Sequence, residues 1–284
     1  MKKAYMLLFA CILTSFILVL TACTKNPLSD DDISLVQRTT VKGKIQLSDN
    51  STPVNVFIWL EGLEVSTYSN ANGNFTLTLP APQTQPGGGL TGDYMLYYYL
   101  GNYEYATSSV SIVDGYFRFG EQDIADNGSI KQTIQLQKLL RIETTIVPPR
   151  MNVGDTLDVT ISISLRALSG PVKVETLKEN TDFVLAIFFR PQEKPIEDVL
   201  QLPCNLQPQE ETIQLSKKWY VNLYTHWIHI PEEQAVYDIV PYLRVIQDGL
   251  PDALIQSISP NADKYNYEYL HIPYKWNLGQ FSVE

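Results

Sequence analysis

Strict alternation of apolar and polar residues most restricts the folds open to this chain. In the clearest run, Leu157, Val159, Ile161, Ile163 and Leu165 recur at every second position. Successive side chains of an extended strand point to opposite faces, so this run buries one face and leaves the other polar. A helical period does not fit it. The segment therefore predicts a long strand in an antiparallel sheet with one solvated face.

Similar short runs occupy most of the chain. They are rich in Val, Ile, Thr, Tyr and Phe, and 17 prolines and 15 glycines separate them. This pattern is typical of β-sandwiches, and we find no convincing amphipathic helix. We therefore predict an all-β protein of two consecutive β-sandwich domains, spanning 40–140 and 141–284. Further strands of the second domain are expected at 181–189, 211–215, 220–230, 237–245 and 281–283.

Three motifs follow one another in the first of these domains: Gly43-Lys44-Ile45, Pro53-Val54-Asn55-Val56 and Ser69-Asn70-Ala71-Asn72-Gly73-Asn74-Phe75. Gly73 would supply the positive φ of a turn, after which Phe75 and Leu77 point to one side. Together the motifs resemble the carboxypeptidase regulatory-like domain, a transthyretin-like β-sandwich with a carbohydrate-binding-like fold. The family commonly has Asp where this chain has Asn70, so no calcium site is inferred there.

The same resemblance implies a protein without catalytic activity. In metallocarboxypeptidases this module is a non-catalytic appendage of a zinc domain that is missing here. The segment His229-Ile230-Pro231-Glu232 matches the His-x-x-Glu half of the zinc-ligand pattern of those enzymes. His271, however, follows Glu232 by only 39 residues of β-rich chain, which is much less than the spacing in the enzymes. On a strand, His226 and His229 would face opposite ways. No other catalytic motif is present. We therefore expect no enzyme activity, no metal site and no cofactor.

The second domain opens with proline-rich chain. Pro148-Pro149 leads through a turn at Gly154-Asp155 into the alternating strand described above. This order resembles the start of immunoglobulin-like and fibronectin-like domains, which is a weak signal because many sandwiches share it. The two halves of the chain do not resemble each other.

The N-terminus carries an export signal. Lys2-Lys3 precedes an apolar run over 4–20, and Leu20-Thr21-Ala22-Cys23 follows. This order reads as a secretory signal peptide, although an uncleaved membrane anchor is the alternative. It resembles the bacterial lipobox, which implies a signal peptide at 1–22, acylation of Cys23 and a lipidated tether at 23–39. Thr24 stands where Asp often retains a lipoprotein at the inner membrane, so we expect the outer membrane. The acidic run Ser29-Asp30-Asp31-Asp32 fits a solvated linker or a surface-export signal.

Net charge restricts the classes of partner that we expect, and cysteine content restricts the possible disulfides. Cleavage after Ala22 would leave 19 basic and 31 acidic residues, a formal charge of −12. Such a chain repels nucleic acid and anionic membrane surfaces, so neither is expected as a partner of the folded part. Cys11 leaves with the signal and Cys23 is acylated, so no intramolecular disulfide can form. Cys204 is then a small buried hydrophobe or the link of a disulfide-bonded dimer.

Two stretches are rich in aromatic residues. The first holds Tyr94, Tyr97, Tyr98, Tyr99, Tyr103 and Tyr105, and the second Tyr265, Tyr267, Tyr269, Tyr274 and Trp276. Flat rings stack on sugars, but tyrosine is also a common strand residue. On one strand, Tyr97 and Tyr99 share a side and Tyr98 takes the other. Packing, a protein interface and glycan stacking stay open, and the candidate binding residues are Tyr97, Tyr98, Tyr99, Tyr103, Tyr267 and Trp276.

These observations favour a non-enzymatic, lipid-anchored protein of the bacterial cell envelope. Its β-sandwiches would present an interaction surface to another envelope protein. A surface glycan-binding module is the alternative, and a hydrolase without a recognisable motif is the third possibility.

Overall fold

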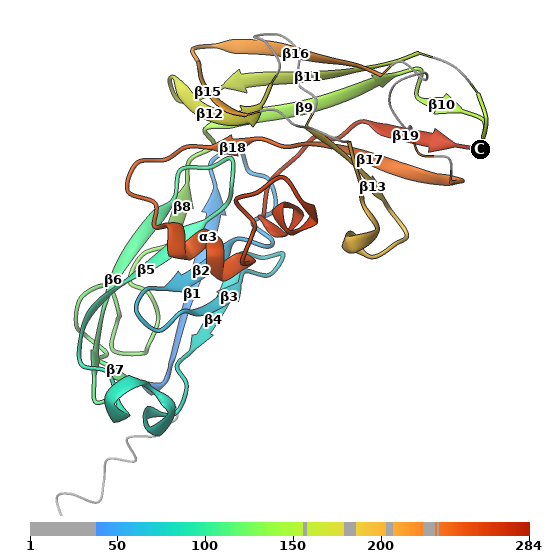
Figure 1. Cartoon of the computed structure of the whole chain (residues 1–284). Helices are drawn as coiled ribbons and strands as arrows, with labels where there is room; N and C mark the ends of the chain where they lie inside the picture. The colour runs from blue at the N-terminus through green and yellow to red at the C-terminus, as the bar shows by residue number, and fades with distance from the viewer. Residues whose placement is uncertain (1–37, 156–157, 179–185, 203–206, 224–230, 232) are drawn as a thin grey trace, which may run out of the picture. The chain divides into compact units, whose positions relative to one another are not determined.

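The computed structural model describes residues 38–155, 158–178, 186–202, 207–223, 231 and 233–284 (Figure 1). Nearly all regular structure in them is β, which confirms the predicted fold class. The exceptions are short 3₁₀ turns and the helix α3 (Asp252–Ile258), which the sequence analysis missed. Residues from Arg38 to Glu284 form one compact unit. In the described part of the chain, no helix has the length and apolar character needed to cross a membrane.

The first β-sandwich-like domain, called here the first sandwich, is built from two sheets. One has the strand order β4-β1-β8 and the other β3-β2-β5-β6-β7. The bounds are β1 (Thr40–Leu47), β2 (Phe57–Leu60), β3 (Val65–Tyr68), β4 (Asn74–Thr78), β5 (Gly92–Tyr99), β6 (Ala106–Val113), β7 (Tyr116–Phe117) and β8 (Ile134–Leu136).

Two of the sequence motifs meet in this core. Phe75 and Leu77 are both buried on the inner side of β4, as predicted. The ring of Phe75 lies over Gly43, where an added Cβ would come 2.4 Å from the ring atom Cε1. Gly43 therefore serves close packing: β1 has no side chain at the place that the ring occupies.

The turn before β4 forms as the sequence indicated. Gly73 has φ 78°, and a Cβ there would lie 2.1 Å from the carbonyl oxygen of Ile45. The Asn70 Oδ1 atom accepts hydrogen bonds from the backbone N–H groups of Asn72 (2.9 Å) and Asn74 (3.1 Å). The Asn70 side chain thus stabilises the turn through its amide oxygen.

The second domain, the second sandwich, has three sheets. Their strand orders are β16-β11-β9, β10-β19-β17-β13-β14 and β15-β12-β18. The bounds are β9 (Leu140–Val147), β10 (Arg150–Met151), β11 (Val159–Ala167), β12 (Val172–Leu177), β13 (Ile187–Pro191), β14 (Leu200–Gln201), β15 (Pro208–Ile213), β16 (Ser216–Leu223), β17 (Ala235–Pro241), β18 (Arg244–Val245) and β19 (Gln280–Val283).

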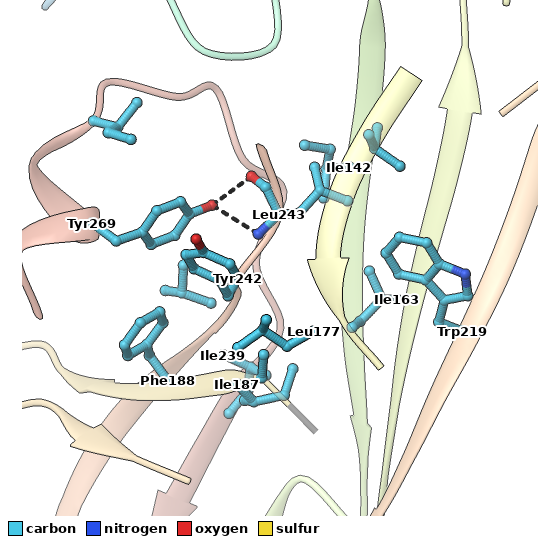
Figure 2. Packing of buried hydrophobic residues seen from close by; sticks show 14 of the residues in the cluster. Ile142, Ile163, Leu177, Ile187, Phe188, Trp219, Ile239, Tyr242, Leu243 and Tyr269 are labelled. Atoms are coloured by element: carbon cyan, nitrogen blue, oxygen red, sulfur yellow. Dashed lines mark hydrogen bonds between the residues drawn. The ribbon is translucent and has the colours of Figure 1, made fainter. Parts of the chain in front are cut away.

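The alternating strand became β11. Val159, Ile161, Ile163 and Leu165 are buried, while Leu157 lies outside the described residues. They pack with Trp219 of β16 and with the facing sheet, where Ile187 and Ile239 lie (Figure 2). The expected strand at 237–245 is interrupted, since β17 ends at Pro241 and β18 starts at Arg244. Proline cannot donate a ladder hydrogen bond, which suits a strand end.

Candidate binding surface

The predicted tyrosine cluster is buried. On β5, Tyr98 points into the core of the first sandwich, and its hydroxyl donates to Ser108 Oγ (3.2 Å). Tyr97 and Tyr99 point to the other side and pack in a second cluster with residues of the second sandwich. The predicted alternation is confirmed. No more than 9% of any of these three side chains is exposed, so they form no platform on the surface.

Tyr103 is also fully buried, at the contact between the two sandwiches. Its carbonyl oxygen accepts a hydrogen bond from Gln247 Nε2 (2.9 Å), and its hydroxyl lies 3.2 Å from Ser51 Oγ. Nearby, Tyr105 N–H donates to Gln247 Oε1 (3.0 Å). The burial of Tyr97, Tyr98, Tyr99 and Tyr103 supports the interpretation that they serve packing and not a binding surface.

Asn102 links the first sandwich to the C-terminal segment. Its Nδ2 donates to the carbonyl oxygens of Leu140 and Lys275, both at 3.0 Å, and its Oδ1 accepts from Lys275 N–H at 3.0 Å. Gly101 N–H donates to Pro273 O (2.7 Å), and the ring of Tyr274 covers the Gly101 Cα. A fully buried amide with its donors and acceptor used gives this contact directional hydrogen bonds.

The second aromatic stretch is mostly part of the same interior. The hydroxyls of Tyr269 (2.7 Å) and Tyr274 (2.8 Å) donate to Leu243 O; Figure 2 shows the first of these bonds. Burial raises the pKa of Tyr242 to about 12 and raises the pKa of Tyr269 well above its ordinary value. These hydroxyls therefore stay protonated and act as structural donors.

Of the six predicted binding residues, Tyr267 has the most exposed side chain, at 39%. It lies at the start of the 3₁₀ turn η4 (Tyr267–His271). Trp276 is half-buried and stacks on Tyr274, with ring centroids 4.3 Å apart. The ring of Tyr267 contacts His271 instead, with centroids 6.5 Å apart, so Trp276 and Tyr267 do not form one stacking pair.

The polar neighbours of this stretch are engaged in turns. Glu268 accepts hydrogen bonds from Asn261 N–H (2.7 Å), Asn261 Nδ2 (3.1 Å) and Ser259 Oγ (2.9 Å), and these bonds lower its pKa. Asn266 Oδ1 accepts from Glu268 N–H (2.8 Å) and caps η4. The carbonyl oxygen of Asp263 accepts from Tyr242 (2.6 Å). These contacts explain the residues as turn formers.

Metal and nucleophile candidates fall largely outside the described residues. This holds for Cys23, Cys204, His226, His229 and Glu232. Among the residues that are described, no group of three or more His, Cys, Asp and Glu side chains is placed to hold a metal ion. The expectation of no metal site therefore stays a prediction, as does acylation of Cys23.

A surface that the sequence analysis did not identify lies on the outward side of the sheet β16-β11-β9. We call it the cationic face and define it by Arg141, Glu143, Ser164, Arg166, Ser216 and Lys218. Register places Arg166 opposite both Arg141 and Ser216, and Ser164 opposite both Glu143 and Lys218. These residues line a shallow depression of about 490 Å³.

Within the described part of the chain, the cations of this face have no ion-pair partner. Arg141, Arg166 and Lys218 make no salt bridge with any described residue, although Lys218 Nζ lies 5.3 Å from the centroid of the Tyr220 ring. At the rim, in contrast, Lys217 pairs with Glu211 (3.5 Å), which also pairs with the buried Lys178. Three cations on one sheet face without an ion pair to any described residue contrast with the chain as a whole, which has ten more acidic than basic residues.

Two exposed leucines lie at one end of the sheet β16-β11-β9, beyond Arg166 and Ser216. Leu215 is 78% exposed in the turn between β15 and β16, and Leu168 is 40% exposed after β11. Ala167 N–H donates to Leu215 O (2.9 Å), which places both residues at the same end of the sheet. We call this pair the leucine end. Sequence analysis assigned Leu215 to a strand; the useful signal was its position before Ser216-Lys217-Lys218, where a turn exposes it.

Comparison with known proteins adds little. No protein-family model matches the sequence, and no curated protein is a significant match. A solved structure of BcpA, the major pilin subunit of Bacillus cereus, is 9% identical with a TM-score of 0.21, covering 72% of this chain and 68% of the pilin. A variant of that pilin is also 9% identical, with a TM-score of 0.23, and the match covers 72% of this chain and 66% of the variant. The Bacillus anthracis TIE protein is 7% identical, with a TM-score of 0.23, and the match covers 74% of this chain and 48% of that protein. Similarity this low carries no argument about function.

Proposed function

We propose that this chain is a non-enzymatic lipoprotein of the bacterial cell envelope that presents a protein-binding surface. Acylation at Cys23 would anchor it to a membrane, which we propose is the outer membrane. Residues 23–39 would form the tether. The lipobox-like sequence supports the anchor, and the Gly43, Gly73 and Phe75 arrangement is compatible with a carboxypeptidase regulatory-like module.

The observation that carries the proposal is the pairing of the cationic face with the leucine end. Exposed leucines at the end of a sheet whose arginines have no ion-pair partner among the described residues combine an apolar contact with charge complementarity, which is the composition of a protein-binding patch. Arginine is also enriched among residues that dominate binding energy at interfaces. We therefore assign the binding role to the second sandwich.

The contact between the sandwiches supports a scaffold role. Asn102 and Tyr274 join segments more than 170 positions apart in sequence through partly buried hydrogen bonds and ring packing. A partner held at the leucine end would thereby be connected to the first sandwich through ordered structure. Burial of the Tyr97 to Tyr99 segment leaves the glycan alternative without the aromatic platform that suggested it.

In-cell photo-crosslinking tests the function. A photoreactive amino acid replaces Leu215 in the lipidated chain, and in a matched control it replaces Val153, which is 52% exposed and whose N–H donates to Glu284 O. We expect position 215 to give a discrete adduct with an envelope protein, identified by mass spectrometry, and position 153 to lack it. Identical products from both positions, or no adduct from position 215, would contradict the proposed role.

A further inference from the structure

We propose that the cationic face binds an acidic polypeptide segment that also carries an apolar side chain. This inference rests on the proposed function and specifies the chemistry of the partner. The carboxylates of the segment would meet Arg141, Arg166 and Lys218, and its apolar side chain would meet the leucine end.

The arrangement of the arginines indicates an anionic ligand. Arg141 and Arg166 are directly opposite each other on neighbouring antiparallel strands and point to the same face. Like charges at directly opposite positions destabilise a strand pair. Neither guanidinium has a carboxylate partner among the described residues, so nothing within this part of the chain offsets the repulsion. A bound carboxylate would offset it and could accept two hydrogen bonds from one guanidinium.

Lys218 adds a second cationic position. It lies on β16 beyond Ser164, one row further from the leucine end than Arg166. Glu143 occupies the opposite side of that row. Its negative charge would disfavour a polymer with an anion at every unit. A polypeptide segment whose carboxylates are separated fits this arrangement of charges better, because its N–H groups can donate hydrogen bonds to Glu143.

The leucine end distinguishes a polypeptide from other anions. Leu215 is among the most exposed apolar side chains described, and Leu168 lies at the same end of the sheet. A polysaccharide or free phosphate offers no aliphatic side chain to cover them. A peptide with a leucine-like residue near its carboxylates would bury that surface and pair the arginines at the same time.

Fluorescence anisotropy with defined peptides provides the test. The protein is the purified full chain carrying Cys23→Ser, and the probe is a labelled peptide repeating Glu-Glu-Leu. We expect saturable, salt-sensitive binding, and weaker binding of peptides repeating Glu-Glu-Ser or Lys-Lys-Leu. Arg166→Glu should weaken binding by about tenfold or more, which corresponds to ~1.4 kcal/mol. Leu215→Ser should weaken it several-fold.

Matched controls share the chemistry but not the location. Lys42→Glu reverses an exposed cation of the first sandwich that has no ion pair with a described residue, and Val153→Ser removes another exposed apolar side chain. Both should bind the peptide like the parent protein. Circular dichroism confirms that each variant is folded.

Several outcomes would overturn the inference. These are no saturable binding of the Glu-Glu-Leu peptide, equal binding by Arg166→Glu, or tighter binding of polygalacturonate or of vesicles containing phosphatidylglycerol. The last two would assign the face to an anionic glycan or a lipid surface. If crosslinking from position 215 still captures one envelope protein, only the partner chemistry fails. If that adduct is also missing, the proposed function fails with it.

Discussion

Strands β2 and β5 are buried on both faces, but by different parts of the chain. On the inner face, Ile58 and Tyr98 belong to the core of the first sandwich. On the outer face, Trp59 and Tyr97 belong to the cluster that includes the second sandwich. The comparison shows that a strand with apolar residues at every position can connect two cores, with each face depending on different partners.

The two faces also differ in polar contacts. The Tyr98 hydroxyl donates a hydrogen bond to Ser108, whereas the indole Nε1 of Trp59 is buried without a hydrogen-bond partner in the described structure. An unpaired buried donor costs free energy. The outer face is therefore stabilised mainly by apolar contact, and directional bonds between the sandwiches come from Asn102 and from Gln247, which bonds to Tyr103 and Tyr105.

The largest effect should follow from truncation in the inner core. Phe75→Ala removes a ring that fills the space above Gly43 and should lower the free energy of unfolding by about 3–5 kcal/mol. Denaturant unfolding of the full chain measures this. Tyr68→Ala is the control, because its ring is 45% exposed. Equal unfolding midpoints for Phe75→Ala and the parent protein would disprove the core assignment.

A somewhat smaller effect is expected from the outer face, and it should depend on context. In the full chain, Trp59→Ala should cost about 2–4 kcal/mol, since loss of the ring is partly offset by removal of its unpaired N–H. In a fragment of residues 40–140, where the second sandwich is absent, the same change should cost little. Circular dichroism first establishes that the fragment is folded, and denaturant melts then compare the losses. Equal losses in both would remove the distinction between the faces.

Asn102→Ala should destabilise the full chain by about 1–3 kcal/mol, because it leaves Lys275 N–H and the Leu140 carbonyl without partners. Hydrogen exchange should increase first in the segment around Lys275. Asn127→Ala provides an exposed asparagine control. An unchanged exchange rate at Lys275 would show that Asn102 does not hold this contact.

The smallest effect concerns acid. Burial alone would raise the pKa of Asp49, but hydrogen bonds from Lys138 (2.9 Å) and Ser51 (2.7 Å) lower it below its ordinary 3.8. A lowered folded pKa stabilises the protein above pH 3.8, and that contribution declines as pH falls below this value. Asp49→Asn should cost about 1 kcal/mol or less at neutral pH and flatten the acid dependence. An unchanged pH profile of thermal unfolding would contradict this.

Local sequence signals predicted the inner face well. The alternation around Phe75 and the positive φ of Gly73 depend on neighbouring residues, so pattern and turn chemistry were sufficient. The same rule separated Tyr98 from Tyr97 and Tyr99. It did not show that the side carrying Tyr97 and Tyr99 would also be buried, because the residues that cover that side come from the second sandwich.

Distant contacts explain what sequence reasoning missed. Asn102 meets Lys275, and Gly101 meets the ring of Tyr274, through pairings that no local period encodes. The helix α3 has only seven residues and no side-chain N-cap, so it gave little signal. The cationic face joins Arg141, Arg166 and Lys218 from three strands, and only the register brings them together.

The central claim is that this chain acts from a lipid anchor, and acylation of Cys23 tests it most directly. Cells producing the full chain or Cys23→Ser are labelled with radioactive palmitate and then fractionated. We predict that label enters the parent protein in the membrane fraction, and that Cys23→Ser takes up none and is released or kept unprocessed. Equal palmitate incorporation into both proteins would contradict the account.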